Sequence, residues 1–84
     1  MSYLELMIKV MNTMSEDNFR ELDTMVEILN HRYDRARTPG DFQTIWVLLD
    51  SFKDIIFLWE DTAFMGATEV LGAWQRENME GEVL

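Results

Sequence analysis

The sequence predicts an all-α protein, a three- or four-helix antiparallel bundle that homodimerisation could complete. Two long segments repeat apolar residues at alternating spacings of three and four, which is typical of helices that bury one face. No stretch alternates polar and apolar residues with a period of two, so no strand is predicted. The 84 residues allow one domain with a single small core.

The first predicted helix covers about residues 2–13. Its charged residues Glu5 and Lys9 lie on one narrow stripe, and apolar residues occupy most of the remaining surface. We therefore expect other elements to cover this helix on several sides, with its methionines as adaptable core residues.

The second predicted helix covers about residues 16–37 and begins after Ser15, a capping hydroxyl followed by two acids. Its seam repeats at heptad spacing. The seam residues are Phe19, Leu22, Val26, Leu29, Tyr33 and Ala36.

The third predicted helix covers about residues 39–60. Thr38 is its expected cap, Pro39 suits the first helical position, and Asp41 lies near the positive end of the helix dipole. Its seam is the strongest pattern in the chain. The seam residues are Phe42, Ile45, Leu49, Phe52, Ile56, Trp59 and Ala63.

A fourth helical segment covers about residues 62–78, with residues 80–84 as an acidic tail. Its apolar face stays roughly in phase with the preceding seam, so the two segments could form one rod of roughly 60 Å. The alternative is a break near Asp61–Gly66. Gly66 and Gly72 each weaken a continuous helix by about 1 kcal/mol, but no proline decides between the two arrangements.

The short turn at Thr38 predicts that the second and third helices pack antiparallel. The third and fourth segments carry further apolar residues away from the seam: Val47, Phe57, Leu58 and Met65. We expect the first helix to cover these four and make them core. If they are instead exposed, they form a patch that marks a binding site. A second copy could cover what remains.

Charge and composition exclude several classes of function. Sixteen acids against seven bases give a net charge of −9, which opposes direct binding to nucleic acid or to an anionic membrane. The absence of cysteine excludes disulfides, thiol nucleophiles and zinc knuckles. No apolar run is long enough to span a membrane, and the first residues lack the features of a signal peptide. A cytoplasmic location is the simplest expectation.

Two clusters invite a functional interpretation. His31, Arg32, Arg35 and Arg37 could contact an anion, although cations at the end of a helix also offset its dipole. Asp23, Glu27 and His31 share one helix face, but three collinear ligands with no facing set cannot close a coordination sphere. We therefore predict no metal, cofactor or catalytic residue.

The second half of the chain is strongly acidic. Residues 38–84 hold nine acids and two bases, a local charge of −7. Asp50, Asp54 and Asp61 share one stripe, with about 6 Å of helix rise between the first two. Carboxylates at such intervals can imitate nucleic-acid phosphates toward a basic groove. A stripe of this kind also serves simply to keep a surface hydrated.

These observations predict a small acidic protein-interaction module rather than an enzyme. We expect it to act as an inhibitor or adaptor that docks its acidic face on a basic, nucleic-acid-binding protein surface. Compact inhibitors that phages make against host defences have this charge and size, which is an analogy only. The expected partner-binding residues are Val47, Asp50, Asp54, Phe57, Leu58, Glu60, Asp61 and Glu69. The alternatives are a metal-dependent hydrolase that uses helical carboxylates and a structural subunit of a larger assembly.

Overall fold

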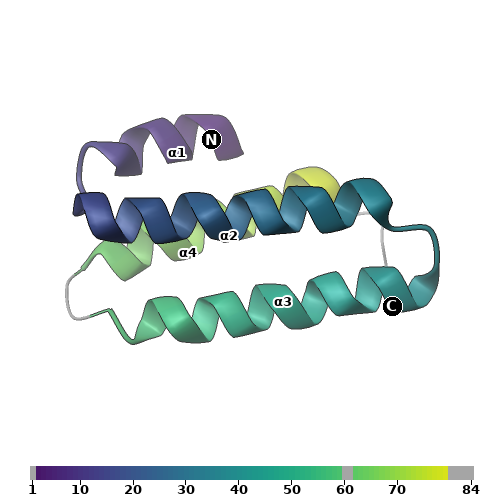
Figure 1. Ribbon diagram of the computed structural model, residues 1–84. Helices are drawn as coiled ribbons and strands as arrows, with labels where there is room; N and C mark the ends of the chain where they lie inside the picture. The colour runs from purple at the N-terminus through teal and green to yellow at the C-terminus, as the bar shows by residue number, and fades with distance from the viewer. Residues whose placement is uncertain (1, 60–61, 80–84) are drawn as a thin grey trace.

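The computed structural model describes residues 2–59 and 62–79 and folds them into four helices with no strand in these ranges (Figure 1). The helices are α1 (Tyr3–Met11), α2 (Glu16–Arg35), α3 (Pro39–Phe57) and α4 (Ala63–Met79). The all-α prediction is therefore confirmed for the described residues. The predicted tail and the expected partner-binding residues Glu60 and Asp61 lie outside them.

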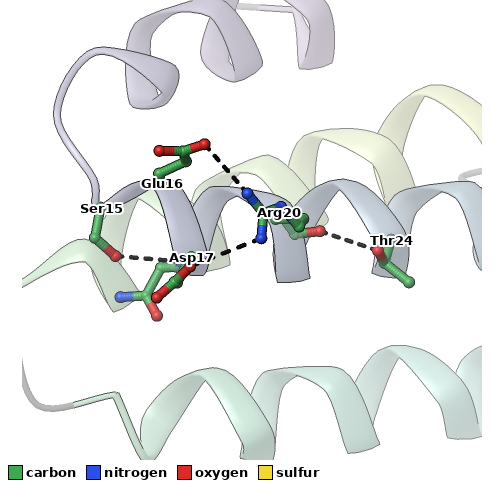
Figure 2. Close-up of polar contacts among 6 residues, drawn as sticks. Ser15, Glu16, Asp17, Arg20 and Thr24 are labelled. Carbon is green, nitrogen blue, oxygen red and sulfur yellow. Dashed lines mark hydrogen bonds and ion pairs between the residues drawn. The ribbon is translucent and has the colours of Figure 1, made fainter.

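Short polar side chains start three of the helices. The Ser2 hydroxyl accepts a hydrogen bond from the Glu5 amide (3.2 Å), which caps α1. The Ser15 hydroxyl does the same for α2, as Figure 2 shows. At α3 the Thr38 hydroxyl accepts from the Asp41 amide while the Asp41 carboxylate accepts from the Thr38 amide. These bonds satisfy amides that no helical carbonyl can reach.

The apolar seams of α2 and α3 bring these two helices together. Leu22, Val26 and Leu29 of α2 are buried, as are Ile45, Leu49 and Ile56 of α3. Only residues 36–38 join the helices, so α3 returns along α2 in the opposite direction (Figure 1). The burial that the heptad spacing predicts is thus observed on both helices.

The third and fourth predicted segments do not form one rod. Helix α3 ends at Phe57, where the Leu58 amide donates to the carbonyls of Ile55 and Ile56, and α4 begins at Ala63. The two helices then pack on each other: the rings of Phe57 and Phe64 lie 5.4 Å apart. The break is favoured because a straight rod would leave the apolar face of α4 without a partner in the chain. That face is buried here, with Trp74 fully inaccessible to solvent.

Helix α1 packs chiefly on α4 and more lightly on α2. Val10 of α1 lies over Gly66 of α4, where a β-carbon would come within 2.7 Å of Val10 Cγ1. Gly66 therefore permits a close approach of the two helices. The expectation that α1 is covered on several sides is wrong, because its nine residues form one buried face only. The exposed apolar residues of α1 are Leu4, Ile8 and Met11.

One hydrogen bond links the buried Trp74 of α4 to the exposed Asn30 of α2. The Trp74 indole donates to the Asn30 side-chain oxygen at 2.7 Å, and its ring meets Tyr33 edge-on. This bond satisfies the only polar group of a large buried side chain. Within residues 2–59 and 62–79, no helix combines the length and apolar character needed to cross a bilayer.

Candidate interaction surface

The outward side of α3 carries apolar and acidic residues together. Val47, Asp50, Asp54 and Phe57 follow one another at spacings of three, four and three, which places them on one face of the helix. All four are exposed, with Val47 at 58% and Phe57 at 68% relative exposure. Leu58, at the end of the helix, is 81% exposed. We call these five residues the outer stripe.

The first helix does not cover these apolar residues. We expected it to pack over Val47, Phe57, Leu58 and Met65, and this expectation is wrong, since all four are exposed. The reason is geometric: α1 lies against α4 and α2 and makes no contact with α3 in the described part of the chain. The structure thus places these four side chains on an open surface. This is what the alternative interpretation, a patch that marks a binding site, requires.

The carboxylates of the outer stripe form no ion pair within the described ranges, and the nearby Lys53 ammonium donates to Gln75 instead. Among the described residues, ion pairs join only Arg20 to Glu16 and Asp17, so Asp50 and Asp54 take part in none. Their side chains begin about 6 Å apart along the helix axis. Glu69, the other expected partner-binding acid within the described residues, is exposed on α4 and does not belong to the stripe.

The basic cluster divides into two parts. The Arg37 guanidinium donates to the backbone carbonyls of Asp34 and Ala36, at 2.9 and 2.7 Å, so this side chain caps the end of α2. His31, Arg32 and Arg35 instead line an open hollow of about 340 Å³ beside Ala36, Asp41 and Thr44. His31 and the two arginines form no ion pair within the described ranges. They are therefore free to meet an anionic group from outside.

The sequence analysis did not predict the apolar groove that lies between α2 and α3. Its apolar lining is Met25 and Ile28 from α2 and Phe52 and Ile55 from α3, around a space of about 630 Å³. The heptad pattern places Phe52 in the seam of α3, but it does not indicate that Ile28 and Ile55 stay exposed, at 39% and 44%. The rim on α2 is polar. Arg20 is held there by Glu16 and Asp17 (Figure 2).

Two ionisable groups have shifted pKa values. The backbone amides of Arg37 and Thr38 donate to the Asp41 carboxylate and lower its pKa below the ordinary value of 3.8. Burial raises the pKa of Tyr3, and the charges of Asp23 and Glu77 raise it further. Both shifts follow from local structure. Neither group lies among the expected partner-binding residues.

Two further features bear on chemistry. No three histidine or carboxylate side chains within residues 2–59 and 62–79 lie close enough together to hold a metal ion, and this includes Asp23, Glu27 and His31. The Trp59 indole donates to Glu21 at 3.0 Å. The Trp46 indole N–H is buried and has no acceptor among the described residues.

The surface of this chain therefore offers three features: the outer stripe, the basic hollow and the apolar groove. Comparison with known proteins adds no relative, because no family model, curated protein or solved structure matches the chain.

Proposed function

We propose that this protein is a non-enzymatic interaction module that docks the outer stripe of α3 on a basic surface of a partner protein. The observation that carries the proposal is the joint exposure of carboxylates and large apolar side chains on one face of one helix. Large exposed apolar groups beside polar ones are typical of protein-binding surfaces. The proposed partner surface is one that otherwise binds nucleic acid, and the cytoplasm stays the predicted compartment.

The two kinds of side chain have different roles in this proposal. Asp50 and Asp54, in a chain of net charge −9, steer a basic partner toward the stripe and select it by charge. Val47 and Phe57 supply apolar area, which contributes roughly 25 cal/mol for each Å² removed from water. An acidic stripe without apolar residues would bind weakly and with little specificity, since exposed ion pairs contribute about 1 kcal/mol or less each.

The test is affinity capture from host lysate with three immobilised proteins: wild type, Asp50→Asn/Asp54→Asn, and the matched control Glu5→Gln/Glu27→Gln. The control removes the same charge from α1 and α2. We expect wild type and control to retain the same basic protein. The double variant at the stripe should lose it.

Salt and nucleic acid sharpen this test. Raising the salt from about 0.1 M to about 1 M shortens the Debye length from about 10 Å to about 3 Å, so the partner should elute. Duplex DNA added at low salt should also displace the partner, because both ligands use its basic groove. Capture of an acidic partner would contradict the proposal, as would retention that does not change when salt or DNA is added. Equal loss of the partner from the control variant would contradict it too.

We also propose, as the sequence predicts, that the chain pairs with a second copy. The supporting observation is the second apolar surface, the groove between α2 and α3. At 3.6 residues per turn, Ile55 in the groove and Phe57 on the outer stripe point about 160° apart. A dimer through the groove would therefore leave Asp50, Asp54 and Phe57 of the outer stripe free for a partner, whereas Leu58, about 60° from Ile55, lies closer to the groove.

A further inference from the structure

The apolar groove and the basic hollow belong to one continuous surface. A smaller hollow lies between them, lined by Glu27, Ile28, His31 and Arg32. It shares Ile28 with the groove, and it shares His31 and Arg32 with the basic hollow. One trough therefore runs along α2, with residues of α3 lining it toward both ends, and we call it the α2–α3 trough.

The two ends of the trough have opposite charge. At one end the first turns of α2 hold three acids and Arg20, a local charge of −2. At the other end stand His31, Arg32 and Arg35, and the one acidic residue lining that hollow is Asp41. The Asp41 carboxylate already accepts hydrogen bonds from the amides of Arg37 and Thr38. The three acids at the other end, in the first turns of α2, are Glu16, Asp17 and Glu21.

Apolar residues lie midway between these ends. Glu21 and Arg35 are each seven residues from Ile28, or about 10.5 Å along the helix in opposite directions. The trough therefore has an acidic end, a centre at Ile28 with Glu27 beside it, and a basic end, and the two ends lie at matching distances from the centre. Such a surface complements itself when it is turned end over end.

We propose that a second copy of this chain docks in the α2–α3 trough, related by a two-fold axis that passes beside α2 at the level of Ile28. The axis lies in the interface, perpendicular to the helices, so α2 runs antiparallel to α2 of the second copy. Glu21 of each copy, whose carboxylate also accepts a hydrogen bond from the Trp59 indole, then meets Arg35 of the other. The two Ile28 side chains meet at the centre. This inference rests on the proposed pairing of two copies and is independent of docking by the outer stripe.

The charges favour a second copy in this orientation over other arrangements. A parallel arrangement would place acid against acid at one end and base against base at the other, which costs free energy. On the α3 side, Thr44, Phe52 and Ile55 bring no charge to the trough, and Asp41 brings one carboxylate that is already hydrogen-bonded to backbone amides. The trough is thus a surface on which two chains of charge −9 can approach with attraction rather than repulsion.

The test measures mass by sedimentation equilibrium across a range of protein concentrations at low salt. Wild type should show twice the 10.0 kDa mass of one chain. Arg35→Glu makes both ends acidic and should raise the dimer dissociation constant on the order of tenfold. Adding Glu21→Arg to Arg35→Glu exchanges the ends and should restore the dimer. Only a reciprocal contact between these positions gives that rescue.

A second pair of variants tests the centre. Ile28→Glu places two carboxylates together on the axis and should abolish the dimer, whereas Val47→Glu, on the outer stripe, should leave it intact. Circular dichroism checks that both variants stay helical. Wild type at 10.0 kDa throughout would overturn the proposal, as would a dimer that survives Ile28→Glu or one that Val47→Glu dissociates. Capture by the outer stripe is measured separately, so failure of one proposal is distinguishable from failure of the other.

Discussion

The contact between α1 and α4 and the contact between α2 and α3 differ in how completely they are closed. At the first, Val10 sits over Gly66 so closely that a β-carbon would not fit. At the second, the seam is buried, but a groove of about 630 Å³ stays open along one edge. The same chain thus holds one contact packed to its limit and one with apolar side chains still facing solvent.

This difference separates residues that hold the fold from residues that are available for binding. Leu29 and Ile28 are neighbours on α2, yet Leu29 is fully buried and Ile28 is 39% exposed. Burial of Leu29 stabilises the folded chain directly. Ile28 stays partly hydrated in the single chain, and only an external partner would cover it fully.

The largest effect should come from substituting these two neighbours. Leu29→Ala removes buried methyl groups and leaves a cavity, so we expect a loss of about 2–5 kcal/mol in the free energy of unfolding. Ile28→Ala should cost about 1 kcal/mol or less at a protein concentration too low for dimers. Urea unfolding measures both. Equal losses would show that the groove is closed in solution.

A smaller effect is expected from alanine at the two glycines of α4. Gly66→Ala forces a β-carbon against Val10; overpacking costs about 1–3 kcal/mol, against a gain of about 1 kcal/mol in helix propensity. Gly72→Ala meets only the end of the Arg76 side chain at 3.6 Å and should stabilise by up to about 1 kcal/mol. Thermal unfolding should therefore shift in opposite directions. A stabilising Gly66→Ala would show that α1 and α4 do not approach closely.

The helical seams could be predicted from the sequence because they depend on local periodicity. Spacings of three and four place Leu22, Leu29, Ile45 and Leu49 on inward faces whatever the neighbouring helix is, and all four are buried. The caps are equally local, since Ser15 and Thr38 act within their own first turns. Local chemistry therefore predicted which segments are helical and which side each one buries.

What covers each helix could not be predicted, because it depends on the tertiary arrangement. Periodicity shows that Val47 and Phe57 lie outside the seam of α3, but not that α1 packs elsewhere. Gly66 looked like a weak point of a helix, and the structure shows it to be a point of close approach. Periodicity could not predict the α2–α3 trough for the same reason, since its lining comes from two helices and from about five turns of α2.

Substitution of Asp41, in the polar turn that joins α2 to α3, should give the smallest change in the free energy of unfolding. The Asp41 carboxylate accepts from the amides of Arg37 (2.9 Å) and Thr38 (3.0 Å), which lower its pKa below 3.8. Because its pKa is lower in the folded than in the unfolded chain, its stabilisation is present above the unfolded value and is lost as the pH falls through the folded value. The free energy of unfolding should therefore decline in that acidic range, and Asp41→Asn should remove this part of the decline.

The control for this prediction is Asp50→Asn, which removes the same charge from the exposed outer stripe and leaves the turn intact. It should preserve the part of the acid-dependent loss that comes from the turn. If Asp41→Asn and Asp50→Asn change the pH profile equally, the loss reflects net charge and not these two hydrogen bonds. A specific effect of Asp41 would show that the open α2–α3 pair is fixed at its connected end by backbone hydrogen bonds, whereas the contact of α1 with α4 depends on close apolar packing.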